Sequence, residues 1–419
     1  MTVSEAYVHA RFADGSSRLV GLYQLVTPQG AAAFGRFSYV GSWRRNEHGR
    51  AFPLDPENLP LAPGPFEARR RERLPGPLAD TTPDRWGRRV VEATRPAARP
   101  PLSPADWLFV TGDERVGCLA FSATSDPPAA SEGFAGAADL AELGEQFERL
   151  DRGEAADANA ARFFQAGRSL GGARPKAAIA LDGALWIAKF QRRDDEYDQC
   201  AAEHATMRLA AACGIETAET RLRDVGPRRV VLVRRFDRTA GPPFRPTAHY
   251  VSALSLLDLD ETSDAGSYLD IAGFLHRISA RHRQDREELF RRMVFNVLSG
   301  NRDDHLKNHA VLCDASGWRL SPAFDIVPQP DFEPMQAIGV GASGAYPSIA
   351  NCLSRCGEFG LDAAPARGIV DRMIETMKPW RRMFSEDGVP DATVRRLERA
   401  FAKSLGEDCE PVTPSPRGR

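Results

Sequence analysis

Lysine is scarce in this sequence: five of its 55 basic residues are lysine, and the others are arginine. Cysteine is scarce too, with seven residues and no C-x-x-C pair, which argues against a disulfide framework and favours reduced thiols in a cytoplasmic protein. No apolar run approaches the roughly 18–20 residues of a membrane helix, and no secretory signal is visible in the first 30 residues. The formal charge of −2 argues against nucleic-acid binding by bulk electrostatics alone.

The length of 419 residues is sufficient for two or three compact units. Three segments in residues 6–40 alternate apolar and polar residues, which predicts a β-rich first unit over residues 1–125. Within that unit, Thr82 is the predicted N-cap of a helix whose first position is Pro83. Residues 126–160 are rich in alanine, glycine and acids, so we expect a linker with one helix at 137–150.

The second half of the chain predicts two further parts. Residues 161–240 contain a glycine-rich loop, a hairpin with an Asp182-Gly183 turn, a helical segment and a buried strand, which together predict a small lobe. Residues 241–405 are mostly helical in pattern, and residues 406–419 have the composition of a disordered tail. The expected fold class is therefore α+β.

The most informative segment is GNRDDHLKN at residues 300–308. It follows a helix with an apolar face, where a run of charged side chains makes a poor core but a good active-site loop. Asp303 and Asn308 are five residues apart, as are the catalytic aspartate and the magnesium-binding asparagine of protein kinases. Asp325, at the end of a short strand, could bridge a metal ion to phosphate oxygens.

Groups suited to holding a nucleotide lie upstream of that loop. The glycine loop SLGGARPK can bring backbone amides close to phosphate oxygens. Its nucleotide-binding candidates are Gly171, Gly172, Ala173 and Lys176. Lys189 on the second hairpin strand can reach the α- and β-phosphates, and Glu203 on the next helix can orient that lysine. Each signal is weak alone, since such residues are common in turns and on solvated faces, but their order is that of a kinase. An arginine-rich chain is also expected to retain lysine where a compact ammonium is needed.

Several segments together resemble one known family. GRSLGGARPK, WIAKF, EHATMRLAAACGIE, VRRFDR, FNVLSGNRDDHLKN and LSPAFDI are similar to the HipA-type serine/threonine kinases, the toxins of bacterial toxin–antitoxin modules. LADTTPDRWGRRVV and DWLFVTGDERVGCLAF resemble the N-terminal subdomain of that family, so the resemblance covers most of residues 5–385. It implies a two-lobed protein-kinase-like fold with a β-rich N-terminal subdomain, a nucleotide-binding small lobe and a mostly helical catalytic lobe.

The resemblance also implies roles for individual residues. Asp303 would be the catalytic base, Asn308 and Asp325 the Mg²⁺ ligands, and Lys307 a neighbour of the γ-phosphate. Lys189 and His305 would contact ATP, and Arg234 and Phe236 would lie nearest the adenine. Members of the family often carry an acidic residue at the position of Arg234, so adenine recognition here is expected to use backbone groups. Ser169 matches a serine that the family's kinases phosphorylate in themselves, which expels the glycine loop and switches the enzyme off.

The partners of this chain are likewise implied by the resemblance. Aminoacyl-tRNA synthetases are the family's substrate class, and phosphorylating one would arrest translation and growth. The usual partner is a small helix-turn-helix antitoxin, and through it operator DNA. ATP and Mg²⁺ would be the cofactors, and no membrane is expected.

Three other readings remain open at the level of sequence. Asp303, Asp304, His305 and His309 could ligate a metal ion for hydrolysis without ATP. A catalytically silent kinase fold could serve as a scaffold or corepressor, although it would have no need for so many converging charges. A small-molecule kinase could share the catalytic loop, but the first unit and Ser169 favour a protein kinase.

Overall fold

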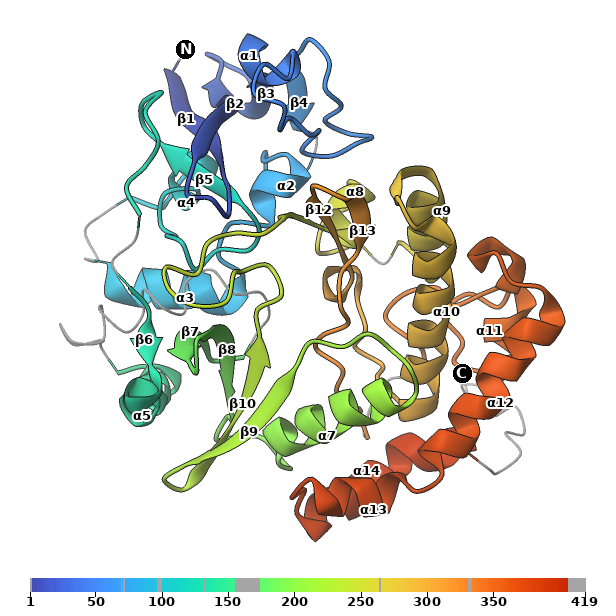
Figure 1. The fold of residues 1–419 in the computed structure, drawn as a ribbon. Coiled ribbons are helices and arrows are strands. Elements are labelled where there is room, and N and C mark those ends of the chain that lie inside the picture. Colours follow the sequence, from blue (N-terminus) through green and yellow to red (C-terminus); the bar gives the residue numbers. More distant parts are fainter. Residues whose placement is uncertain are drawn as a thin grey trace, which may run out of the picture.

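The computed structural model describes residues 2–68, 70, 72–95, 100–130, 133–154, 174–263, 265–330 and 334–405. In these parts of the chain the strands form three sheets, and the helices gather toward the C-terminus (Figure 1). No described helix combines the length and the apolar character needed to cross a membrane. The predicted mixture of a β-rich first part and a helical last part is confirmed.

The first unit is built on an antiparallel sheet in the order β4-β3-β2-β1-β5. The alternation seen in the sequence is realised, because side chains such as Val8, Tyr23 and Phe37 point into one core. Its strands are β1 (Thr2–Arg11), β2 (Ser17–Thr27), β3 (Phe34–Tyr39), β4 (Phe66–Ala68) and β5 (Leu119–Ser122). Its helices are α1 (Gly41–Arg44), α2 (Gly76–Ala79), α3 (Arg85–Thr94) and α4 (Pro104–Trp107).

The start of α3 corrects a prediction. The N-cap is Asp84, whose side chain accepts a hydrogen bond from the amide of Gly87 at 2.8 Å. Thr82, the predicted cap, instead donates its hydroxyl to the carbonyl of Ala79 at 2.8 Å. Threonine and aspartate are both good capping residues. The sequence pattern did not show that the hydroxyl of Thr82 bonds the last residue of α2 instead.

The second sheet forms the small lobe, in the order β6-β7-β8-β10-β9. The Asp182-Gly183 turn joins β7 to β8 as predicted, with φ of +49° and +69°, the left-handed conformations of a tight hairpin turn. The strands are β6 (Ala135–Gly136), β7 (Lys176–Leu181), β8 (Ala184–Phe190), β9 (Thr220–Val225) and β10 (Arg228–Arg234). The adjoining helices are η1 (Ala137–Asp139), α5 (Leu140–Asp151) and α7 (Gln199–Ala212).

The described part of the expected linker belongs to this lobe. Helix α5 buries Leu143 and Phe147 in a cluster with Ile179 and Trp186 of the second sheet, and β6 pairs with β7. Trp86 of α3 joins the same cluster, so a helix of the first unit packs directly on the small lobe. The segment resembles a linker in composition, but Leu143, Phe147 and Leu150 of α5 are spaced so that they share one buried helical face.

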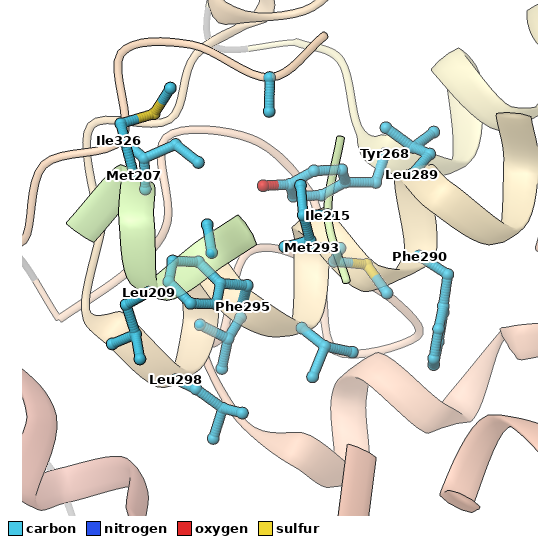
Figure 2. Packing of buried hydrophobic residues seen from close by; sticks show 14 of the residues in the cluster. Met207, Leu209, Ile215, Tyr268, Leu289, Phe290, Met293, Phe295, Leu298 and Ile326 are labelled. Atoms are coloured by element: carbon cyan, nitrogen blue, oxygen red, sulfur yellow. The ribbon is translucent and has the colours of Figure 1, made fainter. Parts of the chain in front are cut away.

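The third part is a helical lobe with a small sheet in the order β11-β12-β13. Figure 2 shows part of its core, to which α10 contributes Leu289, Phe290, Met293 and Phe295 and α9 contributes Tyr268. Its α-helices are α8 (Ala253–Leu256), α9 (Tyr268–Ile278), α10 (His282–Ser299), α11 (Ile349–Ser354), α12 (Ala363–Met377), α13 (Trp380–Glu386) and α14 (Asp391–Leu405). Its short elements are β11 (His249–Ser252), β12 (Ala310–Asp314), β13 (Gly317–Leu320), η3 (Leu306–Asn308) and η4 (Cys356–Phe359).

A buried ion-pair network fastens the first unit to the end of β10. Asp237 bonds Arg235 at 2.6 Å and Arg238 at 2.7 Å, and it accepts from the amide of Gly117 at 2.8 Å. Arg235 also donates to the carbonyl of Glu114 at 2.7 Å, in the loop before β5. Burial opposes ionisation of Asp237, but the two guanidinium groups outweigh it and hold its pKa well below the usual range. The segment after β10 is therefore held in place by hydrogen bonds to the loop that precedes β5 in the first unit.

Candidate active site

A cavity of about 470 Å³ lies where all three parts of the molecule meet. The catalytic-loop candidates Asp303, His305, Lys307 and Asn308 line it together with Asp325. The small lobe contributes Lys176, Lys189, Val233, Arg234 and Phe236. The first unit contributes Arg70, Glu72, Asp80, Asp84, Arg85 and Arg88. The volume is that of a small-molecule site, and residues from segments far apart in sequence share it.

The loop that carries Asp303 begins at a sharp turn. Helix α10 ends at Gly300, whose φ of +68° suits glycine, and the amide of Asn301 bonds back to the carbonyl of Asn296. The Asp303 side chain is exposed to the cavity, while the side-chain amide of Asn308 donates to the Asp303 carbonyl at 3.4 Å. The surrounding protein raises the pKa of Asp303 through burial, and the charges of Asp325 and Asp304 add to that rise.

Asp304 has the opposite environment from its neighbour. It is buried behind the loop, where it bonds His309 and the amide of Asn296 at 2.8 and 2.9 Å and accepts from the hydroxyl of Tyr268. Burial opposes its ionisation, but the contact with His309 outweighs it and lowers the pKa of Asp304. Asp304 and His309 therefore serve the fold rather than the cavity.

This arrangement corrects the metal-hydrolase alternative. Its four proposed ligands divide into two groups: Asp303 and His305 line the cavity, whereas Asp304 and His309 bond each other behind it. Across the described residues, no three histidine, cysteine, aspartate or glutamate side chains are placed to hold a metal ion together. His309 directly precedes β12, so the two histidines of the His-x-x-x-His pattern serve different parts of the structure.

Lys189 lies between two carboxylates. Its Nζ is 2.6 Å from Glu203 Oε1 and 2.5 Å from Asp325 Oδ1. Burial would lower the pKa of Lys189, but Asp325 and Glu203 outweigh burial and raise it, so the ammonium is held charged. Burial raises the pKa of Glu203, which Lys189 partly offsets. The predicted pairing of the strand lysine with the helix glutamate is present.

Asp325 was predicted at the end of a short strand, but β13 already ends at Leu320 and Asp325 lies in the irregular segment that follows. It is held there in an uncommon backbone conformation. Its φ is +60°, in the left-handed region, where a non-glycine residue is unusual and is found more often at functional sites. Burial opposes its ionisation, but Lys189 and Lys176 outweigh it and hold the pKa of Asp325 well below its ordinary range. An ionised Asp325 and the amide oxygen of Asn308 are donors of the kind that Mg²⁺ prefers, and both line the cavity.

The opposite end of the cavity is apolar. Phe236 and Phe324 pack with ring centroids 5.8 Å apart, and Ile187, Val233 and Ile338 are further apolar residues of the cavity lining. Such a slot suits a planar aromatic base. The guanidinium of Arg234 pairs with Glu219 at 3.0 Å, on an exposed part of the surface. The side chain of Arg234 is thus engaged away from a base, as expected if recognition uses backbone groups.

Lys307 lies at the boundary with the first unit. Its Nζ pairs with Glu261, and the charges of Asp80, Glu72 and Asp84 act on it from the facing wall. Burial lowers the pKa of Lys307, and those three carboxylates oppose the fall. Lys307 therefore lines the cavity, with acidic neighbours that the sequence did not reveal, and its place beside the γ-phosphate stays a prediction.

For two sets of residues, the prediction and the structure do not coincide. Ser169, Gly171, Gly172 and Ala173 lie outside the described residues, so their predicted roles stay predictions. The sequence analysis did not identify the first-unit residues that line the cavity, nor the apolar side chains of Phe324 and Ile338. The only local signal for the first-unit residues was the acidic, helix-opening segment 80–84, because its approach to the catalytic loop is a tertiary contact.

The comparisons with known proteins agree with this geometry. The sequence model of the family described as "HipA-like C-terminal domain" matches residues 168–380, half of the chain. "Putative kinase Y4mE" of Sinorhizobium fredii is 31% identical over 153 residues, which are 33% of this chain and 35% of that protein. A "Putative kinase" of Haemophilus influenzae is 25% identical over 182 residues, 39% of this chain and 53% of that protein. The chain thus matches about half or less of each relative.

A solved structure shares the fold over nearly the whole chain. HipA of Shewanella oneidensis, determined in a toxin–antitoxin complex with HipB and operator DNA, matches 95% of this chain and 96% of its own. The TM-score is 0.69 and the sequence identity 17%. The first unit is therefore part of the shared architecture and not an unrelated addition.

Proposed function

The chain belongs to the HipA-like family, and from that premise we propose that it is an ATP- and Mg²⁺-dependent serine/threonine protein kinase. One observation carries the proposal. Lys189 comes from a strand, Asp303 from a loop, Asn308 from a short helix and Asp325 from the irregular segment after β13, and all four line one cavity. A cavity that combines an apolar slot with these charges suits a nucleotide whose base and phosphates need opposite surroundings.

The proposed reaction assigns each group a step. The apolar slot beside Phe236 holds the base, and Lys189, oriented by Glu203, neutralises phosphate charge. Asp303 accepts the proton of a seryl or threonyl hydroxyl as its oxygen bonds to the γ-phosphorus, while the bond to the β–γ bridging oxygen breaks and ADP leaves. Asp325 and Asn308 would hold Mg²⁺, which supplies further charge neutralisation at the phosphates. Lys307 and His305 belong to the same loop and line the cavity, and we propose that they contact the transferred group.

Substrates and partners are extensions of the same proposal. By family resemblance, the acceptor is a hydroxyl of an aminoacyl-tRNA synthetase, and the result is growth arrest. Ser169 is the proposed site of autophosphorylation, which would add roughly −1.5 to −2 charges to a loop built for phosphates and repel ATP. The Shewanella protein was solved with HipB and operator DNA, and a corresponding antitoxin is proposed here.

The decisive experiment is incubation of the full chain with Mg²⁺ and ATP, followed by mass spectrometry of the peptide that contains Ser169. We expect phosphate on that peptide in the parent, and loss of the modification in Asp303→Ala or after EDTA. Ser169→Ala is the matched control, since it removes the acceptor and keeps the site. ATP binding without phosphate transfer to Ser169 or to any added protein would favour the silent scaffold instead.

A further inference from the structure

Asp84 does more than cap helix α3. One carboxylate oxygen, Oδ1, accepts the capping bond from the amide of Gly87. The other, Oδ2, is buried, has no hydrogen-bond partner within the described part of the chain, and lies 3.8 Å from Nζ of Lys176. A cap uses a single oxygen, and leaving a buried carboxylate oxygen without a hydrogen bond is costly. Capping of α3 therefore does not explain why the second oxygen of Asp84 is buried without a hydrogen bond.

Lys176 and Lys189 form a symmetric pair across the small-lobe hairpin. They are direct partners in the β7–β8 register, so their side chains leave the sheet on the same face. Both are buried, and both line the cavity. Lys189 forms an ion pair with Glu203 of α7, and Lys176 forms an ion pair with Asp84, the N-cap of α3. Each lysine thus has one acid from a neighbouring helix.

The two pairs differ in what they leave available. Lys189 is hydrogen-bonded to two carboxylates, whereas Nζ of Lys176 lies 3.8 Å from Oδ2 of Asp84, beyond hydrogen-bond distance. Burial lowers the pKa of Lys176, and Asp84, Asp325 and Glu203 oppose that fall while Lys189 adds to it. Asp84 is the largest of the opposing charges, so it helps to keep the ammonium protonated while leaving its donors free for a ligand.

We propose that Asp84 is a positioning residue for the nucleotide, which holds the charged ammonium of Lys176 toward the triphosphate. The inference rests on the proposed kinase function. It means that the phosphate site of the small lobe is completed by a residue of the first unit. Helix α3 is well placed for this role, because Trp86 and Val90 anchor it in the core of the small lobe.

The test uses a variant that separates the charge from the cap. Asp84→Asn keeps an oxygen that can accept from Gly87 but removes the negative charge. Dissociation constants for Mg-ATP and for adenosine are measured by calorimetry on the full chain between pH 6.5 and 9.5. We expect ATP binding about tenfold weaker in Asp84→Asn, with adenosine binding and the melting temperature unchanged.

The pH profile adds a signature that a structural defect would not give. Lys176 binds phosphate in its protonated form, and it faces Asp84 of α3, Lys189 of β8, Glu203 of α7 and Asp325. Removing the charge of Asp84 makes Lys176 lose its proton more easily, so the affinity for ATP should begin to fall at a lower pH than in the parent. Lys176→Met should weaken ATP binding in the same way, and adding Asp84→Asn to it should cost nothing further.

Two controls make the result decisive. Ser103→Ala removes the N-cap of α4 in the same unit, away from the cavity, and should leave ATP binding unchanged. Equal ATP affinity in Asp84→Asn and parent would overturn the inference, as would an equal loss of ATP and adenosine binding. A parent chain that binds no ATP would instead contradict the proposed function, so the two failures are distinct.

Discussion

Asp303 and Asp304 are adjacent in the sequence, yet their side chains have opposite roles. Asp303 is exposed to the cavity with a raised pKa, and Asp304 is buried in bonds to Tyr268, Asn296 and His309 with a lowered pKa. The spacing to Asn308 singled out Asp303 correctly as the one facing the cavity. Nothing local separates the two acids otherwise, because the partners of Asp304 come from α9, α10 and the start of β12.

The raised pKa of Asp303 predicts the acid side of the pH profile. In the proposed reaction the ionised carboxylate of Asp303 accepts the proton. That form is present only above the pKa, so kcat/KM should fall on acidification at a pH above the ordinary 3.8 of an aspartate. Asp303→Asn should lower kcat by about 10²–10⁴-fold and remove that limb. Initial rates of phosphate transfer, measured for both proteins with Mg²⁺ in excess, provide the check.

Asp304→Asn is the matched comparison for that experiment. It changes a carboxylate that serves the fold, so it should lower the free energy of unfolding, whereas Asp303→Asn should leave it nearly unchanged. If the activity of the parent falls on acidification no more steeply than that of Asp303→Asn, the assignment of Asp303 as the base is contradicted.

At the scale of elements, strongly periodic or turn-coded segments were predicted well. The β7–β8 hairpin has the predicted turn, α10 precedes the loop at residues 300–308 as predicted, and α12 and α14 fall in the segment predicted to be mostly helical. The errors fell where two local solutions competed. Both Thr82 and Asp84 are residues that can cap α3. For α5, the composition of the surrounding segment suggested a linker, and the sequence did not show that the helix packs on the second sheet. Tertiary contacts decided both, and these are not encoded in a short window of sequence.

The turn that ends α10 gives a prediction for an element boundary. Gly300 has φ of +68°, and a Cβ there would lie 2.7 Å from the backbone oxygen of Ala400 in α14. Gly300→Ala therefore combines backbone strain with a clash against an atom that cannot move alone, and should lower the free energy of unfolding by about 2–4 kcal/mol. Urea denaturation followed by circular dichroism measures the change.

Gly183 is the matched control for Gly300. Its φ is +69°, almost the same, but a Cβ there would meet no atom within 4 Å. Gly183→Ala should therefore cost only the strain, about 1 kcal/mol. Equal losses in the two variants would mean that the contact with α14 does not constrain the catalytic loop.

For the whole molecule, the order of kinase parts in the sequence predicted a shared cavity but not its third wall. Lys189, Asp303 and Asp325 could be identified because each sits in a local pattern. The contribution of the first unit could not, since Asp80 and Asp84 carry no catalytic pattern and meet Lys307 and Lys176 only after the three parts pack. The first unit is therefore part of the site in a physical sense, and its attachment should affect nucleotide binding.

Asp237 tests that attachment. It is buried between Arg235 and Arg238, which also bond backbone carbonyls of residues 113–117 in the first unit. Asp237→Asn leaves two buried guanidinium groups without their counter-charge and should lower the free energy of unfolding by about 3–5 kcal/mol. Because the network adjoins Phe236, the affinity for ATP should fall as well.

Asp182→Asn supplies the control, since Asp182 forms an exposed pair with Arg221 at 2.8 Å and tolerates its left-handed φ equally well as asparagine. Its loss should be below about 1 kcal/mol, with ATP affinity unchanged. If Asp237→Asn lowers stability but binds ATP as the parent does, the network holds the fold together without shaping the nucleotide site. Hydrogen exchange, at a temperature where the variant is folded, measures whether residues 113–117 become more mobile. If the affinity for ATP falls together with the protection of these residues, the first unit acts on the site through the segment after β10.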